Sequence, residues 1–99
     1  MLKEVNEWGD IFYYKDEELD IFHREDGPAC EYGEYAGGHK EWYLNGELHR
    51  IDGPAVEWAD GTKYWCLNDR FMEFQEWKVK VRKYYDTEED YLLMLLKLD

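Results

Sequence analysis

Short apolar and aromatic runs separated by turn-forming residues fill most of the chain. In the stretch KEWYLNGELHR, residues 40–50, an aromatic run leads into Asn-Gly and then into a second extended run. Asn-Gly is the strongest short hairpin signal, because both residues tolerate the positive φ angles of a tight turn. Asp60-Gly61 lies between aromatic runs in the same way. The pattern predicts a meander of antiparallel hairpins.

The predicted strands are short and follow one another along the chain, so we expect each to pair with its sequence neighbours. They cover residues 11–15, 18–22, 28–32, 39–44, 47–50, 54–58, 62–67 and 70–72.

The period of the apolar positions changes after residue 72. Phe74, Trp77 and Val81 recur at the spacing of one helix face. The embedded segment WKVKV alternates instead, so a strand is the alternative over residues 75–84, but the longer helical period and the Glu, Gln, Lys and Arg between the apolar positions favour a helix.

A second helix is expected to begin after Thr87, which is suited to cap it, with Asp90 at the third helical position. Residues 91–96, YLLMLL, are apolar nearly all round. Such a helix must be buried, either against the sheet or against a partner chain. The sequence thus predicts a mainly β, α+β fold. We expect residues 1–72 to form a hairpin-repeat meander and residues 73–99 to form a helical cap on the same single domain.

One decapeptide occurs twice, as HREDGPACEY from residue 23 and as HRIDGPAVEW from residue 49. His, Arg and Asp in one motif are compatible with metal binding or acid–base catalysis. We favour a structural turn, because a unique active site does not need two copies. In this interpretation Asp pairs with Arg, Gly supplies a free φ angle, and Pro restarts an extended segment. The predicted turn residues are His23, Arg24, Asp26, Gly27, Pro28, His49, Arg50, Asp52, Gly53 and Pro54.

The stretch KEWYLNGELHRIDGPAVEWADGTKYWCLND resembles the MORN-like β-hairpin repeats, whose units read WYxNGxxHRxDGPA and are common in bacterial and phage proteins. The resemblance covers residues 7–72 and is most specific over residues 49–67. Asp69 stands where the units have Gly, and the YGEYAGG connection is an insertion. The resemblance implies an elongated β-meander with a binding or scaffolding role and no shared catalytic residues.

The net charge of −12 and the 18% aromatic content narrow the possible partners. An acidic chain is repelled by phosphate backbones and by anionic membranes, so we expect no direct contact with either. A basic protein is the expected partner. Motifs for nucleotide, metal or nucleophile chemistry are absent from the sequence. We therefore predict a non-enzymatic protein without catalytic, cofactor-binding or metal-ligating residues.

The start of the chain, MLKEVNEWGD, lacks the apolar core of a secretory signal, which predicts a cytoplasmic location. In a reducing compartment Cys30 and Cys66 are expected to be buried thiols, the alternatives being a disulfide or a metal pair. His39 has no copy in the repeat and is expected on a Gly-rich surface loop.

Aromatic and acidic side chains of the predicted sheet are the candidate partner-binding residues, since aromatic residues dominate the binding energy of many interfaces. They are Trp8, Tyr35, Trp42, Trp58, Glu31 and Glu57. The alternative is that these rings pack between hairpins or under the helices. A basic cluster, Lys78, Lys80, Arg82 and Lys83, is interpreted as the solvated face of a helix, with phosphate contact as the alternative.

The function predicted from these features is that of an acidic protein-interaction module. The sharpest form of this prediction is a phage-encoded inhibitor that occupies a basic surface of its partner as a nucleic-acid mimic. The alternative is a structural repeat protein of a larger assembly. The sequence leaves open the oligomeric state, and whether the acidic or the aromatic face binds.

Overall fold

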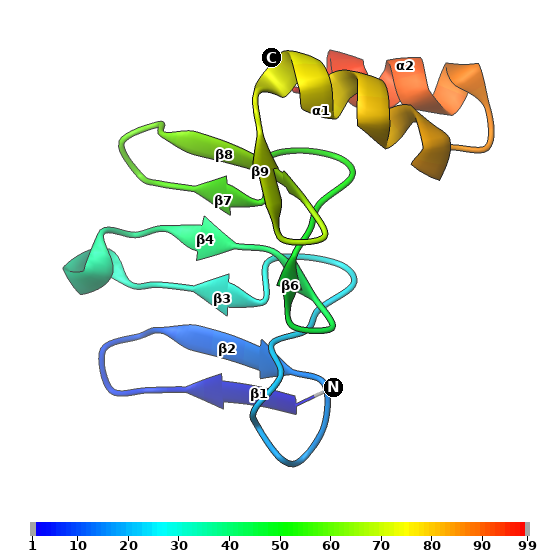
Figure 1. Cartoon of the computed structure of the whole chain (residues 1–99). Coiled ribbons are helices and arrows are strands. Elements are labelled where there is room, and N and C mark those ends of the chain that lie inside the picture. The colour runs from blue at the N-terminus through cyan, green and yellow to red at the C-terminus, as the bar shows by residue number, and fades with distance from the viewer. Residues whose placement is uncertain (1, 99) are drawn as a thin grey trace.

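Residues 2–72 are built around one antiparallel sheet. In the computed structural model, which describes residues 2–98, seven strands are ordered β1-β2-β3-β4-β7-β8-β9, and β5 pairs only with β6 (Figure 1). The strands are β1 (Leu2–Val5), β2 (Ile11–Tyr14), β3 (Cys30–Glu31), β4 (Lys40–Glu41), β5 (Tyr43–Leu44), β6 (Glu47–Leu48), β7 (Val56–Glu57), β8 (Lys63–Leu67) and β9 (Arg70–Met72).

Two helices follow the last strand and lie beyond the β8–β9 edge of the sheet (Figure 1). Helix α1 (Phe74–Lys80) runs into the 3₁₀ helix η2 (Val81–Tyr84), and α2 (Glu88–Leu96) follows after a short loop. A further 3₁₀ turn, η1 (Glu34–Ala36), lies between β3 and β4. The predicted α+β class is confirmed, and residues 75–84 are helical. None of the helices within residues 2–98 is long and apolar enough to cross a membrane.

The first hairpin differs from the prediction. Strand β2 pairs with β1, which was not predicted, and residues 18–22 form a turn with only an isolated bridge between Phe22 and Tyr14. The reason is a local one. The side-chain oxygen of Asn6 accepts hydrogen bonds from the backbone N–H groups of Trp8 and Asp10, both at 3.0 Å, and so closes the turn between β1 and β2.

The predicted strand over residues 39–44 is divided into β4 and β5 at Trp42. The backbone N–H of Trp42 donates to the carbonyl of Ala55, and its own carbonyl accepts from the N–H of His49. These two partners belong to different segments, so the chain leaves the large sheet at this residue and enters the β5–β6 hairpin.

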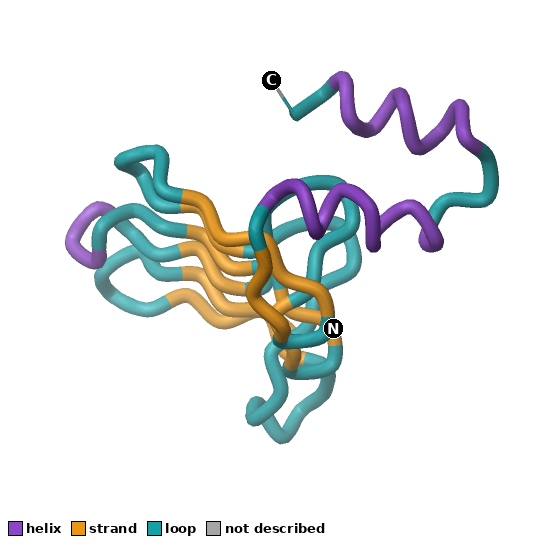
Figure 2. The backbone as a smooth tube through the Cα atoms, turned by 45° about the horizontal axis from the view of Figure 1, so that its top comes forward, coloured by secondary structure: helices purple, strands orange, loops and turns teal. Residues whose placement is uncertain are grey.

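The hairpins β1–β2, β3–β4 and β7–β8 are stacked so that their connecting turns lie at one end of the sheet (Figures 1 and 2). The chain leaves the other end of the sheet to make the β5–β6 hairpin and then returns (Figure 1). Each repeat therefore contributes a strand pair to the sheet and a side hairpin, which gives a molecule of 42 × 30 × 21 Å.

The helical cap is held by a core around Trp77, whose side chain is fully buried. The ring of Trp65 from β8 lies 4.6 Å from the ring of Trp77 and 4.7 Å from the ring of Phe74. Trp77 Nε1 donates a hydrogen bond to the Arg50 carbonyl at 3.1 Å, and the Tyr85 hydroxyl donates to the Ile51 carbonyl at 2.7 Å. The cap is thus bonded to the second copy of the repeated decapeptide.

Helix α2 begins as predicted, because Thr87 Oγ1 accepts a hydrogen bond from the Asp90 N–H at 3.1 Å. Within residues 2–98 this helix is buried along one side only, and the alternative of a partner chain on its other side stays a prediction. Met94 is buried, whereas Leu92 and Leu93 are exposed and Leu96 is 72% exposed. A helix that packs on the β8–β9 edge of the sheet is covered along one side only, so its other side faces solvent.

Cys30 and Cys66 are free thiols and both are fully buried, as predicted. Burial raises the pKa of the Cys30 thiol to about 12 and that of Cys66 to about 11. Both side chains therefore act as small apolar groups at neutral pH.

Replacement of Trp77 by Phe tests how the cap is anchored. The variant keeps an aromatic ring but leaves the Arg50 carbonyl without its donor, so we expect a loss of about 1–3 kcal/mol in the free energy of unfolding. Urea denaturation followed by circular dichroism measures the loss. Trp8→Phe, at an exposed ring, is the control and should change the value by less than about 0.5 kcal/mol. Equal losses in the two variants would contradict this account of the cap.

Candidate functional site

The first copy of the repeated decapeptide is built around Arg24. Its Nε donates to Asp26 Oδ1 at 3.0 Å and its Nη1 donates to the Pro28 carbonyl at 3.2 Å. The guanidinium carbon lies 4.1 Å from the ring centroid of Tyr13 in β2. Such stacking contributes on the order of 0.5–2 kcal/mol. One arginine thus closes its own turn and covers an aromatic ring of the preceding strand.

The second copy repeats this geometry around Arg50. Its Nε donates to Asp52 Oδ1 at 2.8 Å, its Nη1 donates to the Pro54 carbonyl at 3.0 Å, and its guanidinium carbon lies 3.8 Å from the ring centroid of Trp42. Arg50 Nη1 also donates to Glu57 Oε2 at 2.6 Å. The two copies therefore share one structural arrangement.

The role expected for Gly27 and Gly53 needs correction. Neither residue has a positive φ angle, so neither supplies an unusual backbone conformation. A Cβ atom on Gly27 would lie 2.9 Å from Cζ of Arg24, and one on Gly53 would lie 2.6 Å from Cζ of Arg50. Glycine is present because the guanidinium group occupies the space that a side chain would need.

The histidines of the motif join each repeat to the next. His23 Nδ1 accepts a hydrogen bond from the backbone N–H of Asn45 at 2.9 Å, and His49 Nδ1 accepts one from Asn68 at 3.0 Å. Asn45 and Asn68 occupy the same place in successive side turns. Burial lowers the pKa of His49, which favours the neutral ring that this acceptor role requires.

Both motif copies also line one groove of about 700 Å³. Arg24 and Asp26 contribute from the first copy, and His49, Arg50 and Asp52 contribute from the second. Both arginines are engaged by the carboxylates and carbonyls of their own turns, and His49 Nδ1 is occupied by a backbone amide. These contacts account for the motif as a structural element.

A different set of residues gathers at the end of the sheet where the three turns lie (Figure 2). We call residues 6–10, 32–39 and 58–62 the turn-end surface. Its sequence contains neither lysine nor arginine, and it carries the carboxylates of Glu7, Asp10, Glu34 and Asp60. The formal charge of this surface is therefore negative throughout.

Asp10 aligns the first two turns. Its Oδ1 accepts a hydrogen bond from the Gly33 N–H at 2.6 Å, and its Oδ2 accepts one from the Asn6 side-chain amide at 2.9 Å. These donors, Asn6 above all, hold the pKa of the Asp10 carboxyl below its usual range. A Cβ on Gly33 would lie 2.6 Å from the Trp8 carbonyl, so the turns are in close contact here.

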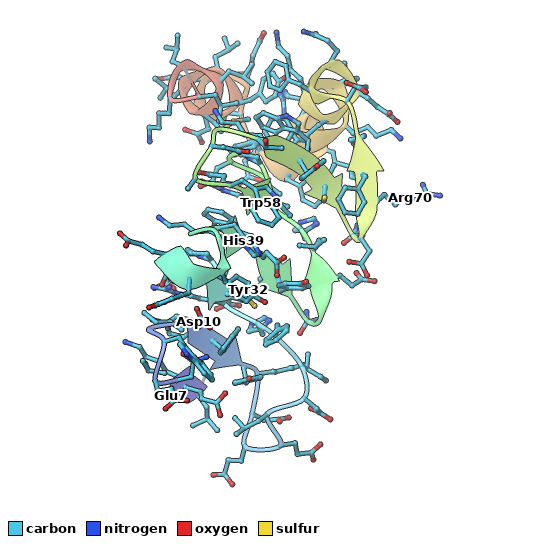
Figure 3. The ribbon with its side chains drawn as sticks, turned by 90° about the vertical axis from the view of Figure 1, so that its left-hand side faces the viewer. Glu7, Asp10, Tyr32, His39, Trp58 and Arg70 are labelled. Atoms are coloured by element: carbon cyan, nitrogen blue, oxygen red, sulfur yellow. The ribbon has the colours of Figure 1, made fainter. Side chains whose placement is uncertain are left out.

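His39 joins the second and third turns, and the expectation that it lies on the surface is wrong. Its ring is buried between Tyr32, at a centroid distance of 4.1 Å, and Trp58, at 4.0 Å (Figure 3). Its Nδ1 lies 3.2 Å from the Ala36 carbonyl, and its Nε2 lies 3.4 Å from Glu41 Oε2. The Trp58 ring is held in position because it packs against the His39 ring, which is itself held on its other face by Tyr32.

Three of the four predicted partner-binding aromatics belong to the turn-end surface. Tyr35 is 92% exposed on η1, Trp8 is 58% exposed and Trp58 is 38% exposed. Trp42 lies elsewhere, with its ring against the Arg50 guanidinium. The motif that follows Trp42 contains the arginine that covers it, which is the signal that could have separated this ring from the others.

Glu31 and Glu57 also lie away from the turn-end surface. In the sheet register, Glu31 is opposite Lys40, Lys40 is opposite Glu57, and Glu57 is opposite Lys63. Opposite charges in such cross-strand positions stabilise a sheet. Arg50 bonds Glu57 in addition, so both acids are occupied within the chain.

Sequence reasoning did not group the carboxylates of Asp16, Glu18 and Asp20. Their oxygen atoms lie within 4.8 Å of one another on an exposed loop between β2 and β3. The positive φ angle of Leu19, 54°, folds this loop tightly and brings the acids together. They add negative charge at the N-terminal end of the array.

Comparisons of the chain with protein-family models, with curated proteins and with solved structures gave no match. The resemblance to MORN-like repeats therefore stays a prediction made from the motif.

The glycine of the motif can be tested by Gly53→Ala. The added methyl group must displace the Arg50 guanidinium, so we expect a loss of about 1–3 kcal/mol in the free energy of unfolding. In an Arg50→Ala background the same substitution should cost at least about 1 kcal/mol less, since the clash is gone. Additive losses in this double-mutant cycle, measured by urea denaturation, would show that the glycine has another role.

The histidine link predicts a pH dependence. Below about pH 6.5 the unfolded chain protonates His49 while the folded chain, with its lowered pKa, keeps the ring neutral. The folded state then binds fewer protons, so stability falls as the pH falls. We expect His49→Ala to be less stable by about 1 kcal/mol at neutral pH. Its stability should also decline less between about pH 7.5 and 5.5 than that of the wild type. Parallel pH profiles in urea denaturation would refute the assignment.

Proposed function

We propose that this protein is a non-enzymatic interaction module that docks its turn-end surface onto a basic protein. One observation carries the proposal. Three stacked turns present the exposed rings of Trp8, Tyr35 and Trp58 among carboxylates, without a lysine or arginine in those turns. Exposed aromatic rings are enriched at interfaces, and a surface of one charge sign selects a partner of the opposite sign.

The rigidity of this surface supports the proposal. The Asp10–Gly33 hydrogen bond joins the first two turns, and the His39 stack joins the second and third. A surface that is ordered before binding loses less conformational entropy when it binds. Aromatic residues held in fixed positions therefore contribute more of their contact energy to affinity.

The net charge of −12 favours a particular kind of partner. A protein that binds nucleic acid through a positive groove attracts a compact acidic protein by long-range electrostatics. Occupation of that groove would exclude the nucleic acid, and an inhibitor of this kind is the sharpest form of the proposal. The alternative role, a component of a larger assembly, is favoured by the exposed leucines of α2, Leu92, Leu93 and Leu96.

Affinity capture with matched variants tests the proposal. We expect the immobilised wild-type chain to retain a basic protein from a cell extract and to release it as salt is raised. Loss of two exposed rings in Trp8→Ala/Tyr35→Ala should reduce retention about tenfold. The control, Tyr64→Ala/Phe71→Ala, removes two exposed rings outside the turn-end surface and should retain the protein like the wild type.

Equal retention by all three chains, or retention that does not respond to salt, would contradict the proposal. For the inhibitor form, the captured protein must also lose its nucleic-acid binding when this chain is added. A stable homo-oligomer of the isolated chain in sedimentation equilibrium would favour the assembly role instead.

A further inference from the structure

A cleft of about 550 Å³ lies between β9 and the α1–η2 helical segment, at the opposite end of the array from β1. Its lining differs from the rest of the molecule in charge. The basic residues that line it are Arg70, Lys80, Arg82 and Lys83. Leu67, Met72 and Val79 contribute apolar side chains, and Val79 is 74% exposed. Acidic residues are absent from the lining within residues 2–98.

Sequence reasoning interpreted Lys80, Arg82 and Lys83 as part of a solvated helix face. The fold brings Arg70, from the β8–β9 hairpin, to the same cleft. Since the chain has a net charge of −12 and these cations contribute +4, the rest of the chain carries −16. The cleft is therefore a local positive region on an acidic protein.

The four cationic side chains of the cleft differ in whether they form an ion pair or a hydrogen bond with other residues of the chain. Lys80 Nζ lies 2.7 Å from Glu76 Oε2, and Arg82 Nη1 donates to the Tyr85 carbonyl at 2.9 Å. Arg70 and Lys83 make no ion pair with any residue of the described range 2–98 (Figure 3 shows Arg70 extending away from β9). These two side chains are available to an anionic ligand.

We propose that this cleft binds an acidic peptide segment that carries an apolar side chain. Carboxylates of the segment pair with Arg70 and Lys83, and its apolar side chain covers Met72 and Val79. Cations around an apolar floor match such a segment, whereas a free phosphate leaves the apolar floor uncovered. A nucleic-acid strand long enough to bind strongly would meet the −16 charge of the remaining surface.

This inference does not rest on the proposed function, because the cleft and the turn-end surface are formed by different residues. A chain with both sites joins a basic protein at its turn-end surface to an acidic segment at its cleft. A negative result for one site therefore leaves the proposal for the other site unaffected.

Fluorescence anisotropy with a labelled DELDEL peptide tests the cleft, at low salt, where charge attraction reaches furthest. We expect the wild type to bind this peptide at least about tenfold more tightly than its neutral counterpart NQLNQL. The variant Arg70→Glu/Lys83→Glu should lose this preference. In NMR spectra of the wild type, addition of the peptide should shift the backbone amide resonances of residues 68–72 and 79–84.

The matched control is Lys3→Glu/Lys15→Glu, which reaches the same net charge of −16 from exposed positions outside the cleft. It should keep the preference, and circular dichroism verifies that both variants are folded. Three results would overturn the proposal: equal binding of the two peptides, an equal loss in both variants, or more efficient displacement by inorganic phosphate or oligothymidylate than by unlabelled DELDEL.

Discussion

The contact on which this molecule depends is an arginine stacked on an aromatic ring and held by its own turn. Arg24 covers Tyr13 and Arg50 covers Trp42, and each arginine also bonds an aspartate and a proline carbonyl two and four residues later. A partly buried guanidinium loses some of its contact with water, and the turn supplies acceptors for its donors. The space that it fills also requires glycine. His, Arg, Asp, Gly and Pro therefore recur together, because each supports the same stacked pair.

The end of the array shows what replaces this contact. Trp65 occupies the position of Trp42 in the next unit, but no His-Arg pair follows it. Its ring is covered instead by Phe74 and Trp77 of α1. Repeat arrays leave an apolar face open at each terminus, and a cap with a different sequence covers it. The helices thus continue the packing of the repeats with aromatic side chains in place of arginine.

The path of the chain through successive hairpins also separates positive from negative charge on the molecule. Each unit returns its hairpin turn to one end of the sheet, so acids and rings from distant segments accumulate there (Figure 3). Within the sheet, acids alternate with lysines across the strands and are largely neutralised. Four cations, Arg70, Lys80, Arg82 and Lys83, line the cleft beside β9. The two proposed sites follow from this separation.

The sequence by itself determined the features that local chemistry governs. These are the Asn45-Gly46 turn, the paired arginine and aspartate of each motif, the capping of α2 by Thr87 and the α+β class. The buried stack of His39 and the presence of Arg70 and Lys83 in one cleft were decided only by the tertiary structure. Each of these depends on which segments become neighbours in the fold, and that follows from how the hairpins and the helical cap pack together rather than from residues adjacent in sequence.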